Sequence, residues 1–160
     1  PRAHTVVVHG ADPRAAALEV HPNGLALHPA IGEHDGGAEL GAAIEGADAI
    51  VIVSPEYNHG YPGALKNALD FLFNEWAHKP VGLVSYGGIS GGMRAAQLLK
   101  PVLVALRLTP AGDVPIPFFN KLFDADGVFK PTDELAKSSA GMLNGLAKWS
   151  PVLAQLRAAK

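Results

Sequence analysis

Residues 54–60, directly after the apolar run Ala49–Val53, read S-P-E-Y-N-H-G and combine polar side chains with proline and glycine. A continuous apolar run is typical of a strand that is covered on both faces. Pro62 marks the start of the helix that follows, since proline loses no hydrogen bond at a first helical position. In open α/β sheets, ligands bind outside the carboxyl ends of the strands, where loops expose backbone N–H groups. We therefore predict a ligand site in this loop, which contains Pro55, Glu56, Tyr57, Asn58, His59 and Gly60.

A second candidate loop follows another apolar run, Val81–Ser85. Its glycines allow the backbone to approach a ligand without a Cβ in the way. A glycine cluster alone is equally typical of a flexible connection, but its position after a strand favours a second ligand loop. The candidate residues in it are Tyr86, Gly87, Gly88, Ser90 and Gly91.

Both loops resemble the flavin loops of the NAD(P)H-dependent FMN reductase family, which includes quinone, azo-dye and chromate reductases. The family's first loop reads S/T-P-E-Y-N and continues as P-G-x-L-K-N-A-x-D. This chain carries S-P-E-Y-N at residues 54–58 and P-G-A-L-K-N-A-L-D at residues 62–70. The resemblance, which extends from about Ala47 to the C-terminus, implies a flavodoxin-like fold with FMN as cofactor and NAD(P)H as co-substrate. It also implies a quinone, a flavin or a similar small molecule as electron acceptor.

The resemblance further implies a role for each loop. Residues 55–58 would wrap the ribityl chain and ring edge of FMN, with His59 and Gly60 close by. Residues 86–88 would form the opposite lip, followed by Ser90 and Gly91, and Arg94 could meet a nicotinamide phosphate or pair with an acid. Oriented N–H groups stabilise the negative charge that reduction builds on the ring. Because hydride transfer to flavin needs no protein acid or base, we expect no catalytic side chain.

The elements that must position these loops alternate between strands and helices. Apolar runs predict strands at residues 4–9, 18–20, 49–53, 81–85 and 113–116, the last at a sheet edge because of its proline. Helical periodicity predicts helices at residues 39–47, 62–72 and 93–106, and one more after Thr132, which Ser150-Pro151 should interrupt or end. This alternation predicts a single α/β domain over residues 1–160 with a doubly wound, parallel five-stranded sheet.

The resemblance is poor before Ala47. In the family, the first strand leads into a Gly-Ser-x-Arg loop and a helix that hold the FMN phosphate. Here only about eight residues separate Gly10 from the next apparent strand, whereas a parallel crossover with its helix needs at least ~10–12. The first helix is therefore expected to be missing, either because this sequence lacks a segment or because the deletion is genuine. Asp12 would repel a phosphate, and Arg14 could replace part of the lost phosphate site.

Composition argues against several classes of partner. The chain has 13 Lys+Arg against 15 Asp+Glu, so no basic field would attract nucleic acid or anionic lipid. No apolar run reaches the roughly 18 residues that a membrane span needs. The absence of Cys rules out disulfides and suits a reducing cytoplasm. We expect a cytoplasmic protein, and the resemblance implies a homodimer or homotetramer in which the helix face at residues 65–76 closes the flavin site.

Alternative hypotheses remain open at this point. His21, His28 and His34 share one loop with Glu33 and Asp35, but their spacing lacks the short pairings typical of metal ligands, so we expect no metal site. A second function class is a flavin-free descendant that binds a small aromatic molecule or serves as a non-redox biosynthetic enzyme. A third is an interaction module that acts through an oligomeric surface. A true deletion after Gly10 would favour the flavin-free protein.

Overall fold

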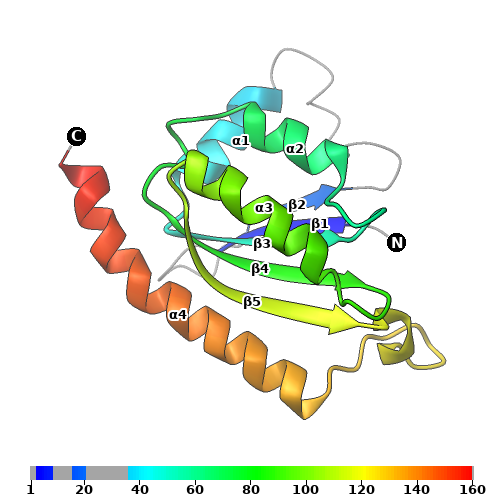
Figure 1. The fold of residues 1–160 in the computed structure, drawn as a ribbon. Coiled ribbons are helices and arrows are strands. Elements are labelled where there is room, and N and C mark those ends of the chain that lie inside the picture. The colour runs from blue at the N-terminus through cyan, green and yellow to red at the C-terminus, as the bar shows by residue number, and fades with distance from the viewer. Residues whose placement is uncertain (1–2, 9–15, 21–35, 160) are drawn as a thin grey trace.

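The computed structural model describes residues 3–8, 16–20 and 36–159 as a sheet with helices on both faces (Figure 1). The sheet has the strand order β2-β1-β3-β4-β5. In chain order, the strands and α-helices are β1 (Ala3–Val8), β2 (Ala16–Val20), α1 (Gly36–Glu45), β3 (Ala49–Pro55), α2 (Gly63–Asp70), β4 (Pro80–Gly87), α3 (Met93–Ala105), β5 (Thr109–Pro117) and α4 (Asp133–Ala158), with a short 3₁₀ turn, η2 (Phe119–Leu122), after β5.

Strands β3, β4 and β5 form the parallel part of the sheet. Ile50 lies opposite Val81 across the first pair, and Val84 lies opposite Val114 across the second. The side chains of β3 are buried along nearly its whole length, as expected of a strand covered on both faces. Strand β5 ends the sheet, so its predicted edge position is confirmed.

The prediction of five parallel strands is wrong for β1 and β2. Strand β1 runs antiparallel to β2, with Ala3 opposite Val20, and antiparallel to β3, with Val6 opposite Val51. Only residues 9–15 separate β1 from β2. A connection of that length can join antiparallel neighbours, but it is too short for a parallel crossover with a helix. The predicted loss of the first helix concerns those residues, which lie outside the described part of the chain.

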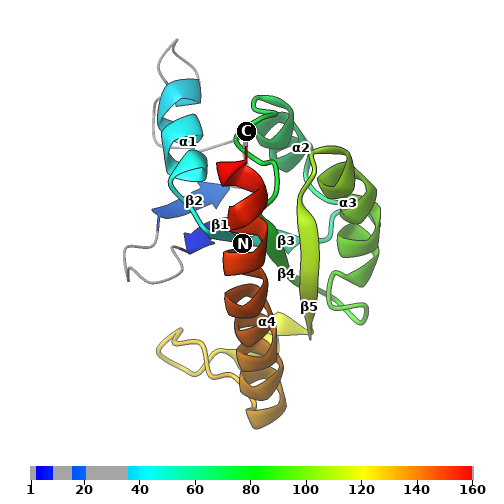
Figure 2. The same cartoon turned by 90° about the vertical axis from the view of Figure 1, so that its left-hand side faces the viewer.

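The two faces of the sheet carry different helices. Figure 2 shows α4 on one face, with α2 and α3 on the other. On the α2 and α3 face, Ile50 and Leu83 pack against Leu69 and Leu99 in the larger core. On the α4 face, a smaller cluster forms around Ala49, Val51, Val114, Met142 and Leu146.

Most helix predictions are confirmed, with one correction in α4. Thr132 caps this helix through the backbone N–H of Leu135, 3.2 Å from the Thr132 hydroxyl. However, α4 continues through Pro151 to Ala158. A proline inside a helix costs about 3 kcal/mol, but Leu146 and Leu153 are buried on either side of it, and Leu146 packs in the cluster that holds α4 against the sheet. Tertiary packing therefore outweighs the local signal.

Among the described residues, none of the helices is long and apolar enough to cross a membrane. The same residues contain no group of three or more His, Asp or Glu side chains that could hold a metal ion. The histidine-rich stretch at residues 21–34 lies outside them.

Candidate functional site at the ends of β3 and β4

The parallel pairing of β3 with β4 brings the two candidate loops together. Pro55 lies opposite Tyr86 at the last pair of the register, and the Glu56 N–H donates to the Tyr86 carbonyl at 3.0 Å. The loops that follow therefore start side by side at the carboxyl end of the sheet, where α/β proteins bind ligands. Two segments more than 25 residues apart in sequence thus form one site.

Glu56 joins the first loop to the second through its carboxylate. The Ser90 hydroxyl donates to Oε1 at 3.0 Å, the Arg94 guanidinium donates to the same oxygen at 2.8 Å, and the Arg94 N–H donates to Oε2 at 3.0 Å. The Glu56 side chain is 8% exposed and that of Arg94 48%. Of the two roles that the sequence left open for Arg94, the structure shows pairing with an acid.

The surroundings of this carboxylate keep it ionised at neutral pH. Burial alone would raise the pKa of Glu56. Hydrogen bonds from the side chains of Arg94 and Ser90, and from the backbone of Arg94 and Ala95, outweigh burial and hold the pKa below its ordinary value.

Residues 57–60 form a tight, projecting turn. The Tyr57 N–H donates to the Gly60 carbonyl at 2.8 Å, and the Gly60 N–H donates back at 2.9 Å. Asn58 and His59, between them, have φ angles of 48° and 69°, the pattern of a type I′ turn. Both residues are exposed, so their side chains stand at the rim of the site.

The second loop contains glycines with two different surroundings. Gly92 has a φ of 81°, and a Cβ there would lie 2.7 Å from the Tyr86 nitrogen, so the backbone itself requires glycine. Gly91, with a φ of 59°, is similarly confined by Pro117. At Gly88, by contrast, an added Cβ would meet nothing within 4 Å. The open space beside Gly88 is where a ligand could approach this loop.

The Tyr86 side chain lies beneath the loop rather than on its rim. It is 7% exposed, and its ring meets that of Phe119 edge-on with centroids 4.9 Å apart. Burial, with a smaller contribution from Tyr57, raises the pKa of Tyr86 to about 12. The phenol is therefore neutral at physiological pH.

Sequence reasoning missed the segment after β5 as part of this site. The Phe118 N–H donates to the Gly88 carbonyl at 3.0 Å, which ties that segment to the second loop. Phe119 continues through Phe123 to Phe129 in a row of edge-on rings. The available signal was the aromatic pair at residues 118–119, directly after the predicted edge strand.

A shallow groove of about 300 Å³ borders the second loop on the α4 side of β5. Ile116, Pro117, Leu122 and Leu135 supply apolar walls, and Glu134 and Ser138 add polar groups. Pro117 also confines Gly91, so the groove and the loop share this strand end.

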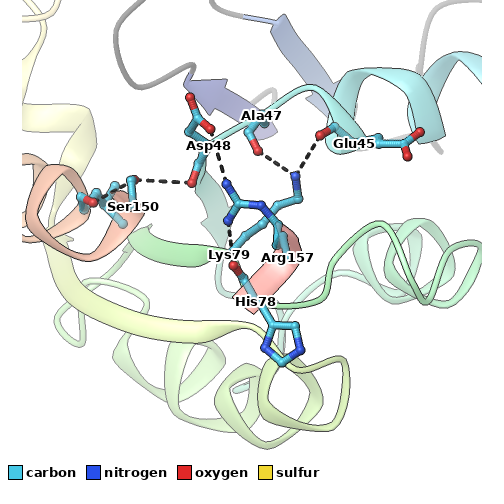
Figure 3. A network of polar contacts seen from close by, with 8 residues as sticks. Glu45, Ala47, Asp48, His78, Lys79, Ser150 and Arg157 are labelled. Carbon is cyan, nitrogen blue, oxygen red and sulfur yellow. Dashed lines mark hydrogen bonds and ion pairs between the residues drawn. The ribbon is translucent and has the colours of Figure 1, made fainter. Parts of the chain in front are cut away.

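The opposite end of the strands is closed by a polar network (Figure 3). The buried Lys79 ammonium donates to the carbonyls of Glu45 at 2.9 Å and Ala47 at 2.6 Å. Arg157 donates to the His78 carbonyl at 2.7 Å and to the Asp48 carboxylate at 3.3 Å. These contacts tie α1, β4 and α4 together, which indicates a structural role.

Arg14, the predicted substitute for a phosphate ligand, lies outside the described residues. The structure brings together the remaining predicted residues, from Pro55 to Gly60 and from Tyr86 to Gly91. It also places Trp76, the last residue of the segment expected to face a partner subunit, in the core of its own chain, where the indole N–H donates to the Leu69 carbonyl at 3.0 Å.

Comparison with known proteins gives consistent results. The family model described as NADPH-dependent FMN reductase matches residues 3–129. An NAD(P)H-dependent FMN reductase of Schizosaccharomyces pombe is 41% identical over 110 residues, which cover 69% of this chain and 54% of that protein. An Escherichia coli quinone reductase is 44% identical over 72 residues, 42% of this chain and 38% of that protein. The chain thus spans about half the length, or less, of these curated relatives.

The fold is also similar to a solved structure. The flavoenzyme NAD(P)H:(acceptor) oxidoreductase FerB of Paracoccus denitrificans aligns with a TM-score of 0.62 and 26% identity. The alignment covers 78% of this chain and 72% of that protein.

Proposed function

Because the chain belongs to the NADPH-dependent FMN reductase family, we propose that it binds FMN between the two loops and passes electrons from NAD(P)H to a small acceptor. A quinone, a free flavin or a similar molecule would be the acceptor, in line with the names of its relatives. The observation that supports this proposal is the pairing of Pro55 with Tyr86, which sets both loops at the carboxyl edge of the parallel strands, where α/β proteins commonly bind ligands.

We propose that the described residues of the two loops hold the ring portion of FMN. The turn at residues 57–60 would offer backbone donors and the Asn58 side chain at one edge of the slot. Gly87 and Gly88 would form the other edge, and the open space beside Gly88 supports this assignment. When bound, FMN supplies the redox chemistry, so the chain's own task is to orient the two reactants and exclude water.

The phosphate portion of FMN needs a separate anion site. The first turn of α3 already receives the Glu56 carboxylate, so it would not serve a phosphate. Arg14 and its neighbours, which are outside the described residues, are the candidates for that site.

The proposal includes assembly and location. We expect a homodimer or homotetramer in which α2 and the residues after it pack against their counterparts and close the flavin site. Phe71 and Phe73, directly after α2, are 59% and 50% exposed, and burial of such side chains is favourable.

A cytoplasmic location is part of the proposal and is supported by the absence of Cys.

A visible absorption spectrum tests the proposed cofactor and the electron donor together. The purified protein is measured before and after incubation with FMN and passage through a desalting column. We expect a retained flavin band that bleaches when NADPH is added under anaerobic conditions. A colourless protein that retains no FMN would contradict the proposal and favour a flavin-free protein with another ligand in the same slot.

A further inference from the structure

Helix α3 obtains its N-terminal cap from a distant part of the chain. Its N-cap residue, Gly92, has no side chain to accept a hydrogen bond, and the first N–H groups of any helix lack partners within the helix. Glu56, 38 residues before Arg94, fills this role with its Oε2. The first loop therefore supplies a cap that the second loop cannot supply for itself.

Several positive or donor groups converge on this one carboxylate. They are the N-terminal end of α3, the Arg94 guanidinium and the Ser90 hydroxyl. The N-terminus of a helix carries a partial positive charge, and hydrogen bonds to ionised groups are stronger than neutral ones. Glu56 is thus an internal anion in an arrangement that elsewhere holds phosphate.

The contacts of Glu56 also restrict the shape of the second loop. Ser90 lies two residues after Gly88, and Arg94 lies in the first turn of the helix that the loop enters. At the other end, the Glu56 N–H is bonded to the Tyr86 carbonyl. The loop is therefore fastened to Glu56 on both sides of its open glycine.

We infer that Glu56 is a positioning residue whose carboxylate holds the second loop in its FMN-binding shape, while its side chain makes no contact with the flavin. This inference rests on the proposed function and deepens it. The negative charge of the Glu56 carboxylate would stabilise the first turn of α3 and the second loop. The backbone of Glu56 carries no such charge and could not replace it.

The test uses the apoprotein with Glu56→Ala, Glu56→Gln and a control, Asp113→Asn. Asp113, on β5, forms an ion pair with Lys100. Lys100 is on α3, as Arg94 is, but lies further from the second loop. FMN affinity is measured by quenching of flavin fluorescence. We expect Glu56→Ala to weaken FMN binding at least tenfold, Glu56→Gln to weaken it less, and Asp113→Asn to leave it unchanged.

Added acetate separates the lost anion from a general loss of structure. Acetate can occupy the space of the missing carboxylate, which the half-exposed Arg94 leaves accessible. We expect sodium acetate to restore FMN binding to Glu56→Ala and to raise the Tm of its apoprotein. Sodium chloride at the same ionic strength should do neither, and acetate should leave the wild-type protein unchanged.

The inference is overturned if Glu56→Ala binds FMN as tightly as the wild type, or if acetate and chloride act alike on this variant. If Glu56→Ala does not fold, Glu56→Gln decides, because it removes the negative charge and keeps an oxygen acceptor in its place. Unchanged FMN affinity in Glu56→Gln would then overturn the inference, and a severalfold loss would support it. Failure of the wild type to bind FMN would instead refute the proposed function, while the acetate-dependent Tm would still report on the internal anion.

Discussion

The residues of the site fall into two groups. Some are required by the backbone conformation of the loops, and others are exposed where a ligand could contact them. A Cβ at Gly91 or Gly92 would collide with neighbouring backbone, and the Tyr86 side chain is buried. Asn58, His59 and Gly88 are exposed. The residues at the rim are therefore those whose replacement should affect ligand binding with little effect on folding.

A matched pair of glycine variants tests this division. Gly92→Ala forces a Cβ to within 2.7 Å of Tyr86 N and Ser85 Cβ at a φ of 81°, so we expect a loss of roughly 1–3 kcal/mol in the free energy of unfolding. Gly88→Ala meets no atom within 4 Å, so we expect unchanged stability but weaker FMN binding. Urea unfolding and flavin fluorescence measure the two effects. Equal destabilisation by both variants would contradict the division.

The two ends of the parallel strands differ in structure: exposed loops lie at the carboxyl ends, and a network of polar contacts lies at the amino ends. At the carboxyl ends, loops project polar groups and glycines. At the amino ends, Lys79 donates to carbonyls at the end of α1, a position where a positive charge is favourable. Arg157 of α4 joins the same region. The contacts at the amino ends hold α1 and α4 in place. The loops at the carboxyl ends are therefore not needed for that purpose.

The pH dependence of stability tests the role of Lys79 at the closed end. Burial is the largest cause that lowers its pKa to about 8, and Arg157 adds to this effect, while Asp48 and Glu45 oppose it. Lys79 gives up its proton more easily in the folded than in the unfolded state. Its charge therefore costs stability below pH 8, and this cost is relieved as pH rises from about 8 towards 10.5.

We therefore expect the free energy of unfolding of the wild type to rise over that range relative to Lys79→Met, by at most about 1.4 kcal/mol per pH unit. Urea unfolding between pH 7 and pH 10 measures the difference. Lys137→Met, an exposed substitution on α4, is the control. Parallel pH profiles for the wild type and Lys79→Met would contradict the expected deprotonation.

At the scale of the whole molecule, the α2 and α3 face has exposed apolar side chains beyond those of its core. Phe71, Phe73, Leu98 and Val104 are each at least half exposed, and α2 and α3 cover the same face of the sheet (Figure 2). Large exposed apolar groups close together are typical of protein interfaces. These four side chains are available to the proposed self-association through this face.

Light scattering on a size-exclusion column tests this association. We expect the wild type to elute with a mass of two or four chains, and the double variant Phe71→Ser, Phe73→Ser to shift towards 16.6 kDa, the mass of one chain. Leu143→Ser, an exposed apolar position on α4, should leave the mass unchanged. A wild-type protein with the mass of a single chain would contradict the association.

Short-range patterns in the sequence determined the central strands, one helix and the position of the first loop. The apolar runs gave β3 and β4, the periodicity of Leu65 and Leu69 gave α2, and the motif after Ser54 located the first loop. Such features depend on residues a few positions apart, so they can be recognised without the rest of the chain. The motif also led to the family, which the comparisons confirm.

Only the tertiary structure decided the features that join distant segments. The antiparallel direction of β1 depends on its pairing with β3, and the partner of Glu56 lies 38 residues away at Arg94. Continuation of α4 through Pro151 depends on burial against the sheet. In each case the local sequence allows several outcomes, and the contact that selects one of them is made only when the chain folds.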